Sequence, residues 1–157
     1  METGGKKQMA NKINIFKEAP NAMKLMLEFE KYLHNETTLE PKLLELIKMR
    51  VSQINRCAYC LDMHTKDALK LGETTQRIFL LNAWRETKLF TDKEKVVLEL
   101  AERVTLLSTH EIDDALHAEV HKYFTNKEFV DLLIAISQIN TWNRNNVSLH
   151  SDIDKNL

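Results

Sequence analysis

Glycine and proline, the residues that most often interrupt regular structure, are almost absent from this chain. Its 157 residues include three glycines and two prolines. Leu, Glu, Lys and Ala fill the stretches between them, and no stretch alternates apolar and polar residues for long enough to predict a strand. Few turn residues favour long helices with short connections. We therefore predict an all-α fold of about seven helices in a single domain.

Capping residues mark the ends of the predicted helices. Pro20 and Pro41 each suit the first turn of a helix, and the helix from Pro41 continues to Ile54. Gly72 suits the left-handed turn after the next helix, which contains both cysteines. The remaining helices are predicted over 75–87, from Asp113 to Phe124, and after two T-x-x-E capping boxes, Thr91 with Glu94 and Thr125 with Glu128.

Composition excludes several classes of partner. The chain has 22 Lys and Arg residues against 23 Asp and Glu, so it has no excess of positive charge for a phosphate backbone. No window approaches the roughly 18 consecutive apolar residues of a membrane span. Residues 1–12 are polar and lack the apolar stretch of a secretory signal, so we expect a disordered tail or leader before a domain over 13–157. These features predict a cytoplasmic protein that binds neither nucleic acid nor membranes.

The chain contains a candidate internal repeat. The tetrapeptide SQIN occurs twice, ending at Asn55 and at Asn140, and the apolar positions that precede it align at the same offset of 85 residues. The alignment predicts two related helices that pack against each other. The simpler alternative is that any two amphipathic helices align somewhere. Cys57 and Cys60 have no cysteine counterparts in the second copy.

The two cysteines lie three residues apart, and a histidine follows the second. In a helix, Cys57, Cys60 and His64 occupy positions i, i+3 and i+7 and share one face. A break near Asn55 places Cys57 in the first turn, where backbone N–H groups favour a thiolate. His64 lies one turn from Cys60 and can take its proton. This arrangement is typical of a redox pair, in which one thiol is oxidised to a sulfenic acid and the other condenses with it into a disulfide.

A carboxylate stands at a fixed distance from the cysteine pair. Glu45 lies twelve residues before Cys57, in the otherwise apolar run LLELI. Its neighbours Leu44 and Ile47 are predicted to face the core, which places Glu45 at the edge of the apolar face. A carboxylate at that edge could relay protons for the thiol pair. A solvated glutamate on a helix flank is the alternative.

Metal binding and purely structural roles are alternatives for these residues. Cys57, Cys60, His64 and Glu45 offer four ligands that zinc accepts, but structural zinc sites usually place a C-x2-C pair in a tight turn, whereas continuous helix is predicted here. A thioredoxin-type pair requires a preceding strand, which the sequence does not predict. A helical scaffold with two buried thiols is the non-enzymatic alternative. A second set of histidines, more typical of a solvated helix than of a metal site, comprises His110, His117 and His121.

The pattern E-x11-C-x2-C-x3-H, formed by Glu45, Cys57, Cys60 and His64, resembles that of the alkylhydroperoxidase D (AhpD) family. That family belongs to the carboxymuconolactone decarboxylase superfamily. The similarity covers the segment PKLLELIKMRVSQINRCAYCLDMHTKDALKLG, and the closing TWNRNNVSLH resembles the family's final helix. The resemblance implies an all-helical fold and thiol peroxidase or disulfide reductase activity. We expect no metal or other cofactor. It also implies homo-oligomers, commonly trimers or hexamers.

By position in this motif, the resemblance implies that Cys60 is the peroxidatic thiol and that Cys57 is its resolving partner and proton donor. Glu45 and His64 would form the proton relay. At Tyr59 the best-known members of the family have a histidine, a far stronger base near neutral pH, so Tyr59 is an accessory residue. The expected partners are a hydroperoxide substrate and an unknown thiol or dithiol electron donor. A decarboxylase-like protein without redox chemistry is the alternative within the superfamily, although such members typically lack the cysteine pair.

Large apolar side chains at helical spacing are predicted to lie in the core or at a subunit interface. If the fold matches the resemblance, some of them wall an apolar pocket over Cys60. Such a pocket favours an organic hydroperoxide over a charged substrate. These side chains are Met49, Phe79, Leu80, Trp84 and Trp142.

Overall fold

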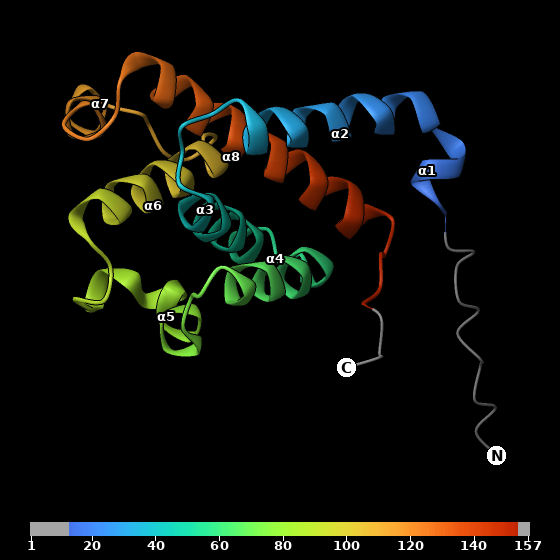
Figure 1. Cartoon of the computed structure of the whole chain (residues 1–157), viewed down its shortest axis with the longest axis horizontal. Coiled ribbons are helices and arrows are strands. Elements are labelled where there is room, and N and C mark those ends of the chain that lie inside the picture. The colour runs from blue at the N-terminus through green and yellow to red at the C-terminus, as the bar shows by residue number, and fades with distance from the viewer. Residues whose placement is uncertain (1–12, 154–157) are drawn as a thin grey trace.

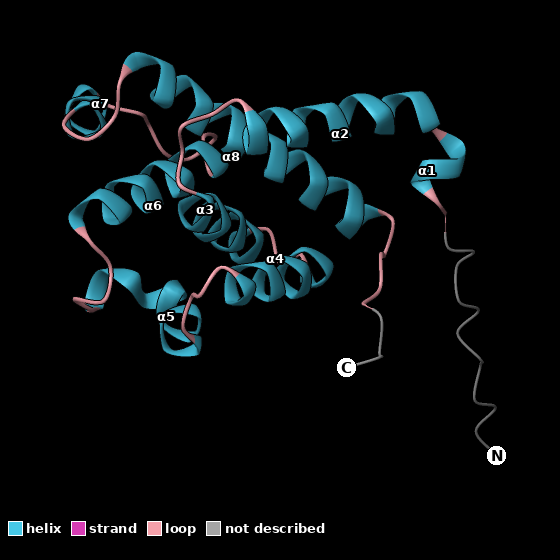
Figure 2. Cartoon of the chain, viewed as in Figure 1, coloured by secondary structure: helices cyan, strands magenta, loops and turns pink. Residues whose placement is uncertain are grey.

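The computed structural model describes residues 13–153 and is built from helices (Figure 1 and Figure 2). The predicted tail or leader, residues 1–12, lies outside the described residues. Residues 13–153 contain no strand, so the predicted all-α fold is confirmed. In chain order the elements are α1 (Ile15–Glu18), α2 (Pro20–Asn35), α3 (Pro41–Ile54), α4 (Ala58–Lys70), α5 (Thr75–Leu80), the 3-10 helix η1 (Leu81–Glu86), α6 (Asp92–Thr105), α7 (Asp114–His121) and α8 (Asn126–Ser148).

Most predicted helix ends agree with the structure. Pro20 and Pro41 occupy the first position of α2 and α3. Thr91 and Thr125 each accept a hydrogen bond from the backbone three residues on, and both complete capping boxes at the starts of α6 and α8. Gly72 has a φ of +82° directly after α4, a conformation that glycine adopts without strain.

Two segments differ from the prediction. The continuous helix expected over 75–87 is instead α5 followed by η1, with a non-helical Ala83. Leu81 and Trp84 are both buried there, and their spacing of three residues matches the period of a 3-10 helix. The short helix α1 was not predicted, and its signal is Asn14, whose side chain accepts hydrogen bonds from two backbone N–H groups.

Helix α3 is the centre of the fold, with α4, α6 and α8 packed around it (Figure 1). Seven consecutive residues, Leu43 to Met49, are buried, whereas an amphipathic surface helix exposes one whole side. The buried run includes two charged residues, Glu45 and Lys48. The central position of α3 therefore brings charges into the interior, where they need partners.

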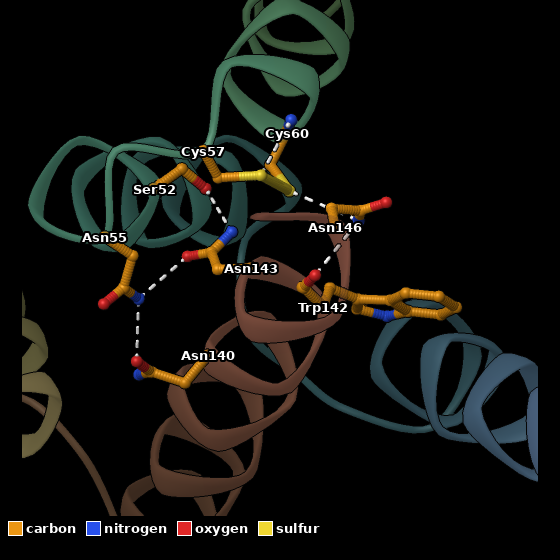
Figure 3. The surroundings of a disulfide bond; sticks show 8 residues. All are labelled: Ser52, Asn55, Cys57, Cys60, Asn140, Trp142, Asn143 and Asn146. Atoms are coloured by element: carbon orange, nitrogen blue, oxygen red, sulfur yellow. Dashed lines mark hydrogen bonds between the residues drawn. A yellow bond between two sulfur atoms is a disulfide. The ribbon is translucent and has the colours of Figure 1, made fainter. Parts of the chain in front are cut away.

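The two helices that carry SQIN pack against each other, as the repeat predicted. Asn55 at the end of α3 donates hydrogen bonds to Asn140, its counterpart on α8, at 2.9 Å and to Asn143 at 3.0 Å (Figure 3). Asn143 in turn donates to the Ser52 hydroxyl at 2.9 Å. This buried polar network connects the end of α3 to the middle of α8.

The predicted large apolar side chains separate into three groups. Met49 and Trp84 are buried in a core cluster with Leu98, away from the cysteines. Phe79 and Leu80 are exposed, Phe79 by 80%, so they are not part of the core. Only Trp142 of these five lies at the cysteine pair, because α8 carries it there.

Candidate active site

The cysteine pair lies where the chain leaves α3 and enters α4. Arg56, just after α3, has a φ of +57°, and this left-handed conformation turns the chain toward α4. Cys57 is the N-cap of α4, with extended backbone angles, and not a residue of its first turn as predicted. The two Sγ atoms form a disulfide, and the Cα atoms are 5.4 Å apart, within the usual range (Figure 3).

Each sulfur accepts a different hydrogen bond. The Cys57 Sγ accepts from the backbone N–H of Cys60 at 3.3 Å, in place of the usual oxygen of an N-cap side chain. The Cys60 Sγ accepts from Nδ2 of Asn146 at 3.6 Å. Asn146 is held on α8 by a second bond from Nδ2 to the Trp142 carbonyl oxygen at 3.0 Å (Figure 3). Both sulfurs are therefore placed beside donors that favour a thiolate.

His64 and Glu45 form a buried pair. His64 Nδ1 lies 2.8 Å from Glu45 Oε2, and both side chains are almost completely buried. Because an ionised carboxylate can only accept, Nδ1 carries the proton, and Nε2 of a neutral His64 is left as the acceptor. The alternative of a solvated Glu45 is wrong: α4 covers the flank of α3 on which it lies.

Two charged residues of the site were missed in the sequence. Lys48 Nζ lies 3.5 Å from Glu45 Oε1 and 3.2 Å from Oε2 of Glu30 on α2. The other oxygen of Glu30 accepts from Nε1 of Trp142 on α8 at 2.9 Å. Lys48 has a sequence signal, since it follows Glu45 by three residues within an apolar run. Glu30 has none, because only the packing of α2 brings it to the site.

A cavity of about 510 Å³ opens beside the pair. Cys60 lines it and Cys57 does not, although both residues are buried. The polar part of its wall includes Glu45, Lys48 and His64. The half-exposed Tyr59 also lines it. Apolar side chains from four helices form much of the remaining wall, among them Phe16, Leu27, Met63, Leu71 and Trp142.

Three residues of this site could approach a metal ion. One ligand atom each from Glu45, His64 and Asp67 lies within 4.8 Å of the others. Both carboxylates already face a cation, Lys48 for Glu45 and Lys70 at 2.7 Å for Asp67, which opposes a further positive charge. The sulfurs proposed as zinc ligands are bonded to each other.

The second histidine set does not form a three-ligand group within residues 13–153. The rings of His117 and His121 lie 4.5 Å apart, centroid to centroid, and His117 also packs edge-on against Phe129 at 5.0 Å. His110 instead bonds to the Thr109 hydroxyl. The spacing of His117 and His121 thus supports an aromatic contact on the α7–α8 side of the fold.

Known proteins share the sequence and the fold of this chain. The sequence model of the carboxymuconolactone decarboxylase family matches residues 20–103. An uncharacterised Bacillus subtilis protein, YdfG, is 42% identical over 141 residues, covering 90% of this chain and 95% of the relative. The solved structure of an Agrobacterium tumefaciens protein of unknown function, described as an antioxidant defence protein of the AhpD type, is 35% identical with a TM-score of 0.87. It covers 91% of this chain and 97% of its own.

A more distant structure has the same fold. A peroxidase-related protein from Ralstonia eutropha, described as having an alkylhydroperoxidase AhpD core, is 16% identical with a TM-score of 0.79. The match covers 89% of this chain and 74% of the other. The predicted resemblance to AhpD-like proteins is confirmed by these matches.

Proposed function

We propose that this chain, which belongs to the carboxymuconolactone decarboxylase family, is a thiol peroxidase that reduces organic hydroperoxides. The observation that carries the proposal is the position of the Cys60 sulfur: it is bonded to Cys57 and lines a largely apolar cavity that also contains the His64–Glu45 pair. A nucleophile, a base and a carboxylate that orients the base are thereby gathered at one wall.

The proposed cycle begins with the reduced protein. His64 Nε2 takes the proton of the Cys60 thiol, and the thiolate attacks the terminal oxygen of the hydroperoxide. The O–O bond breaks, and the alkoxide takes that proton from His64 and leaves as an alcohol. Cys60 is then a sulfenic acid. The Cys57 sulfur attacks it, hydroxide leaves with the Cys57 proton as water, and the disulfide forms. An external dithiol restores both thiols by exchange and is itself oxidised to a disulfide.

The surroundings of the two sulfurs support this division of roles. Cys60 faces the cavity, so a substrate or a donor thiolate can reach it, whereas Cys57 lies behind it. When a donor attacks Cys60, Cys57 is the leaving sulfur. The bond from the Cys60 N–H at the start of α4 stabilises the departing Cys57 thiolate. The helix terminus thus favours the anion on Cys57, and access favours attack by Cys60.

The intact mass of the reduced protein tests the proposal, measured before and after one equivalent of cumene hydroperoxide. Wild type should lose two hydrogens, Cys57→Ser should gain one oxygen, and Cys60→Ser should stay unchanged. If Cys60→Ser gains the oxygen instead, the two sulfurs have exchanged roles. If no form reacts, the peroxidase proposal is wrong.

We also propose that the chain forms homo-oligomers through an apolar groove between α2 and α8. Leu25, Phe29 and Val130 are each about half or more exposed, and they line this groove with Leu133 and Ile134. Exposed apolar side chains gathered in one groove suit contact with a second copy of the chain. Leu25→Glu should reduce the mass measured by light scattering, whereas Leu69→Glu, a matched change on the exposed side of α4, should not. An unchanged mass for Leu25→Glu would place the contact elsewhere.

A further inference from the structure

Lys48 is a lysine in the interior of the protein. Its side chain is 3% exposed, on the central helix α3. Removing an ammonium group from water is costly unless opposite charges replace the lost hydration. Here Glu45 and Glu30 do so, one from α3 and one from α2. The proposed peroxidase cycle assigns Lys48 no step, so its place in the site needs a separate explanation.

The charges around Lys48 form a continuous row. His64 contacts Glu45, Glu45 contacts Lys48, Lys48 contacts Glu30, and Glu30 accepts from Trp142. The row joins α4, α3, α2 and α8, and all five of its members line the same cavity as Cys60. Two acidic side chains and one lysine therefore share the cavity wall with Cys60. Loss of Lys48 and loss of Glu30 therefore change the local charge in opposite directions.

We propose that Lys48 and Glu30 are positioning residues that set, with opposite signs, the pH at which the Cys60 thiolate forms. Lys48 favours the thiolate by its positive charge, and it holds the Glu45 carboxylate in place against His64. Glu30 opposes the thiolate and also fixes the Lys48 ammonium between the two carboxylates. This inference rests on the proposed function only in taking Cys60 as the reactive sulfur.

Other titratable groups face the cavity as well. His34 lines it from α2, and Tyr59, Asp67 and Lys70 line it from α4. Asp67 and Lys70 pair with each other near solvent, so their fields largely cancel and are screened. The lining residues of α8 are uncharged: Trp142, Asn145 and Asn146. These groups are unchanged in all variants below, so they cannot make the pH midpoint of Cys60 alkylation shift up in one variant and down in another.

The test is the rate of Cys60 alkylation by iodoacetamide across pH, measured in a Cys57→Ser background with one thiol. Lys48→Met should move the midpoint of the rate profile up by about one pH unit, and Glu30→Gln should move it down by a similar amount. The double variant should return close to the parent. Glu28→Gln changes the same charge on α2 at a half-exposed position, and its profile should match the parent.

Opposite shifts separate charge from packing. If Lys48→Met and Glu30→Gln move the midpoint in the same direction, or if neither moves it, the inference is wrong. Lys48→Arg keeps the charge and should keep the midpoint. If Lys48→Met does not fold, the downward shift of Glu30→Gln decides alone. Alkylation needs no peroxide, so the outcome is independent of whether the protein is a peroxidase.

Discussion

The two SQIN segments of this protein begin alike and end differently. At the end of the first copy, α3 stops at Ile54; the chain then turns at Arg56, and α4 starts after Cys57. After the second copy, α8 continues unbroken to Ser148. The broken copy gains a helix N-terminus, whose free N–H groups suit a sulfur anion. The continuous copy carries Trp142 and Asn146 past that terminus as its partners.

The two copies also differ in how they are covered. Helix α3 is surrounded, so Ser52 is completely buried, whereas its counterpart on α8, Ser137, is exposed. Arg50 of α3 reaches Glu102 of α6, while the equivalent position of α8 is the buried Ala135. Similar sequences thus serve as a central helix that buries Glu45 and Lys48 and as a helix that buries Asp131 but leaves Ser137 exposed. The position of a helix in the fold, and not its local sequence pattern, therefore determines which of its charged residues are buried.

The largest effects are expected where both copies face the same core. Ile47 and its counterpart Leu132 are each completely buried, so Ile47→Ala and Leu132→Ala should each lower the free energy of unfolding by about 3 kcal/mol. Two helical turns further on, Ile54 is partly exposed and Ile139 is buried. Ile139→Ala should therefore cost more than Ile54→Ala. Urea unfolding measures the free energy lost in all four variants. Equal losses for Ile54→Ala and Ile139→Ala would show that the two copies do not differ in burial at this position.

The polar contact between the copies comes next. Asn143→Ala removes one acceptor from Asn55 and leaves the buried Ser52 hydroxyl without its donor, so it should cost about 2 kcal/mol. Thr141→Ala, an exposed change on the same helix, should cost less than about 0.5 kcal/mol. The same unfolding experiment measures both. If the two costs are equal, the network does not hold the end of α3 against α8.

The ion pair between Arg50 of α3 and Glu102 of α6 has no equivalent on α8, and it should make the free energy of unfolding depend on pH. Burial acts to raise the pKa of the Glu102 carboxyl, but hydrogen bonds from Trp84, Arg50 and Arg85 outweigh it and hold this pKa below its usual 4.5. The carboxylate therefore stabilises the fold above pH 4.5, and this contribution is lost as the pH falls through the folded pKa. Glu102→Gln should cost about 1.5 kcal/mol at pH 7 and less in acid.

Unfolding by urea at a series of pH values measures this difference between wild type and Glu102→Gln. Glu119→Gln on α7, whose carboxylate pairs with Lys122 at the surface, is the control and should show little difference at any pH. If the difference in free energy of unfolding between wild type and Glu102→Gln stays constant into the acid range, the ionised Glu102 carboxylate is not the source of the stabilisation.

The smallest effect concerns the break itself. Arg56 has a left-handed backbone that costs a non-glycine residue roughly 1–2 kcal/mol, so Arg56→Gly should stabilise the protein, by about 0.5 kcal/mol once the entropy of glycine is included. Its counterpart Thr141 lies inside α8, where Thr141→Gly should destabilise by a similar amount. Arg56→Gly should therefore raise the midpoint temperature of thermal unfolding, and Thr141→Gly should lower it. A shift in the same direction for both would contradict the difference in backbone conformation.

The sequence was most informative where the determinants are local. Helix starts at Pro20 and Thr91 follow from groups within four residues, which is why their prediction succeeded. The same reasoning failed for Cys57, which was assigned to the first turn, because the turn at Arg56 moved the start of α4 by one residue. It also failed at Ala83, where the core selected a 3-10 helix.

By itself, the sequence determined the all-helical class and the motif of Glu45, Cys57, Cys60 and His64, because helical period and capping act over one or two turns. Only the tertiary structure decided that Glu45 is buried against His64, that Lys48 joins it, and that Cys60 alone of the two sulfurs lines the cavity. Those outcomes depend on α2 and α8, whose site residues Glu30 and Trp142 are 112 positions apart. A contact of that separation exists only after the helices have packed.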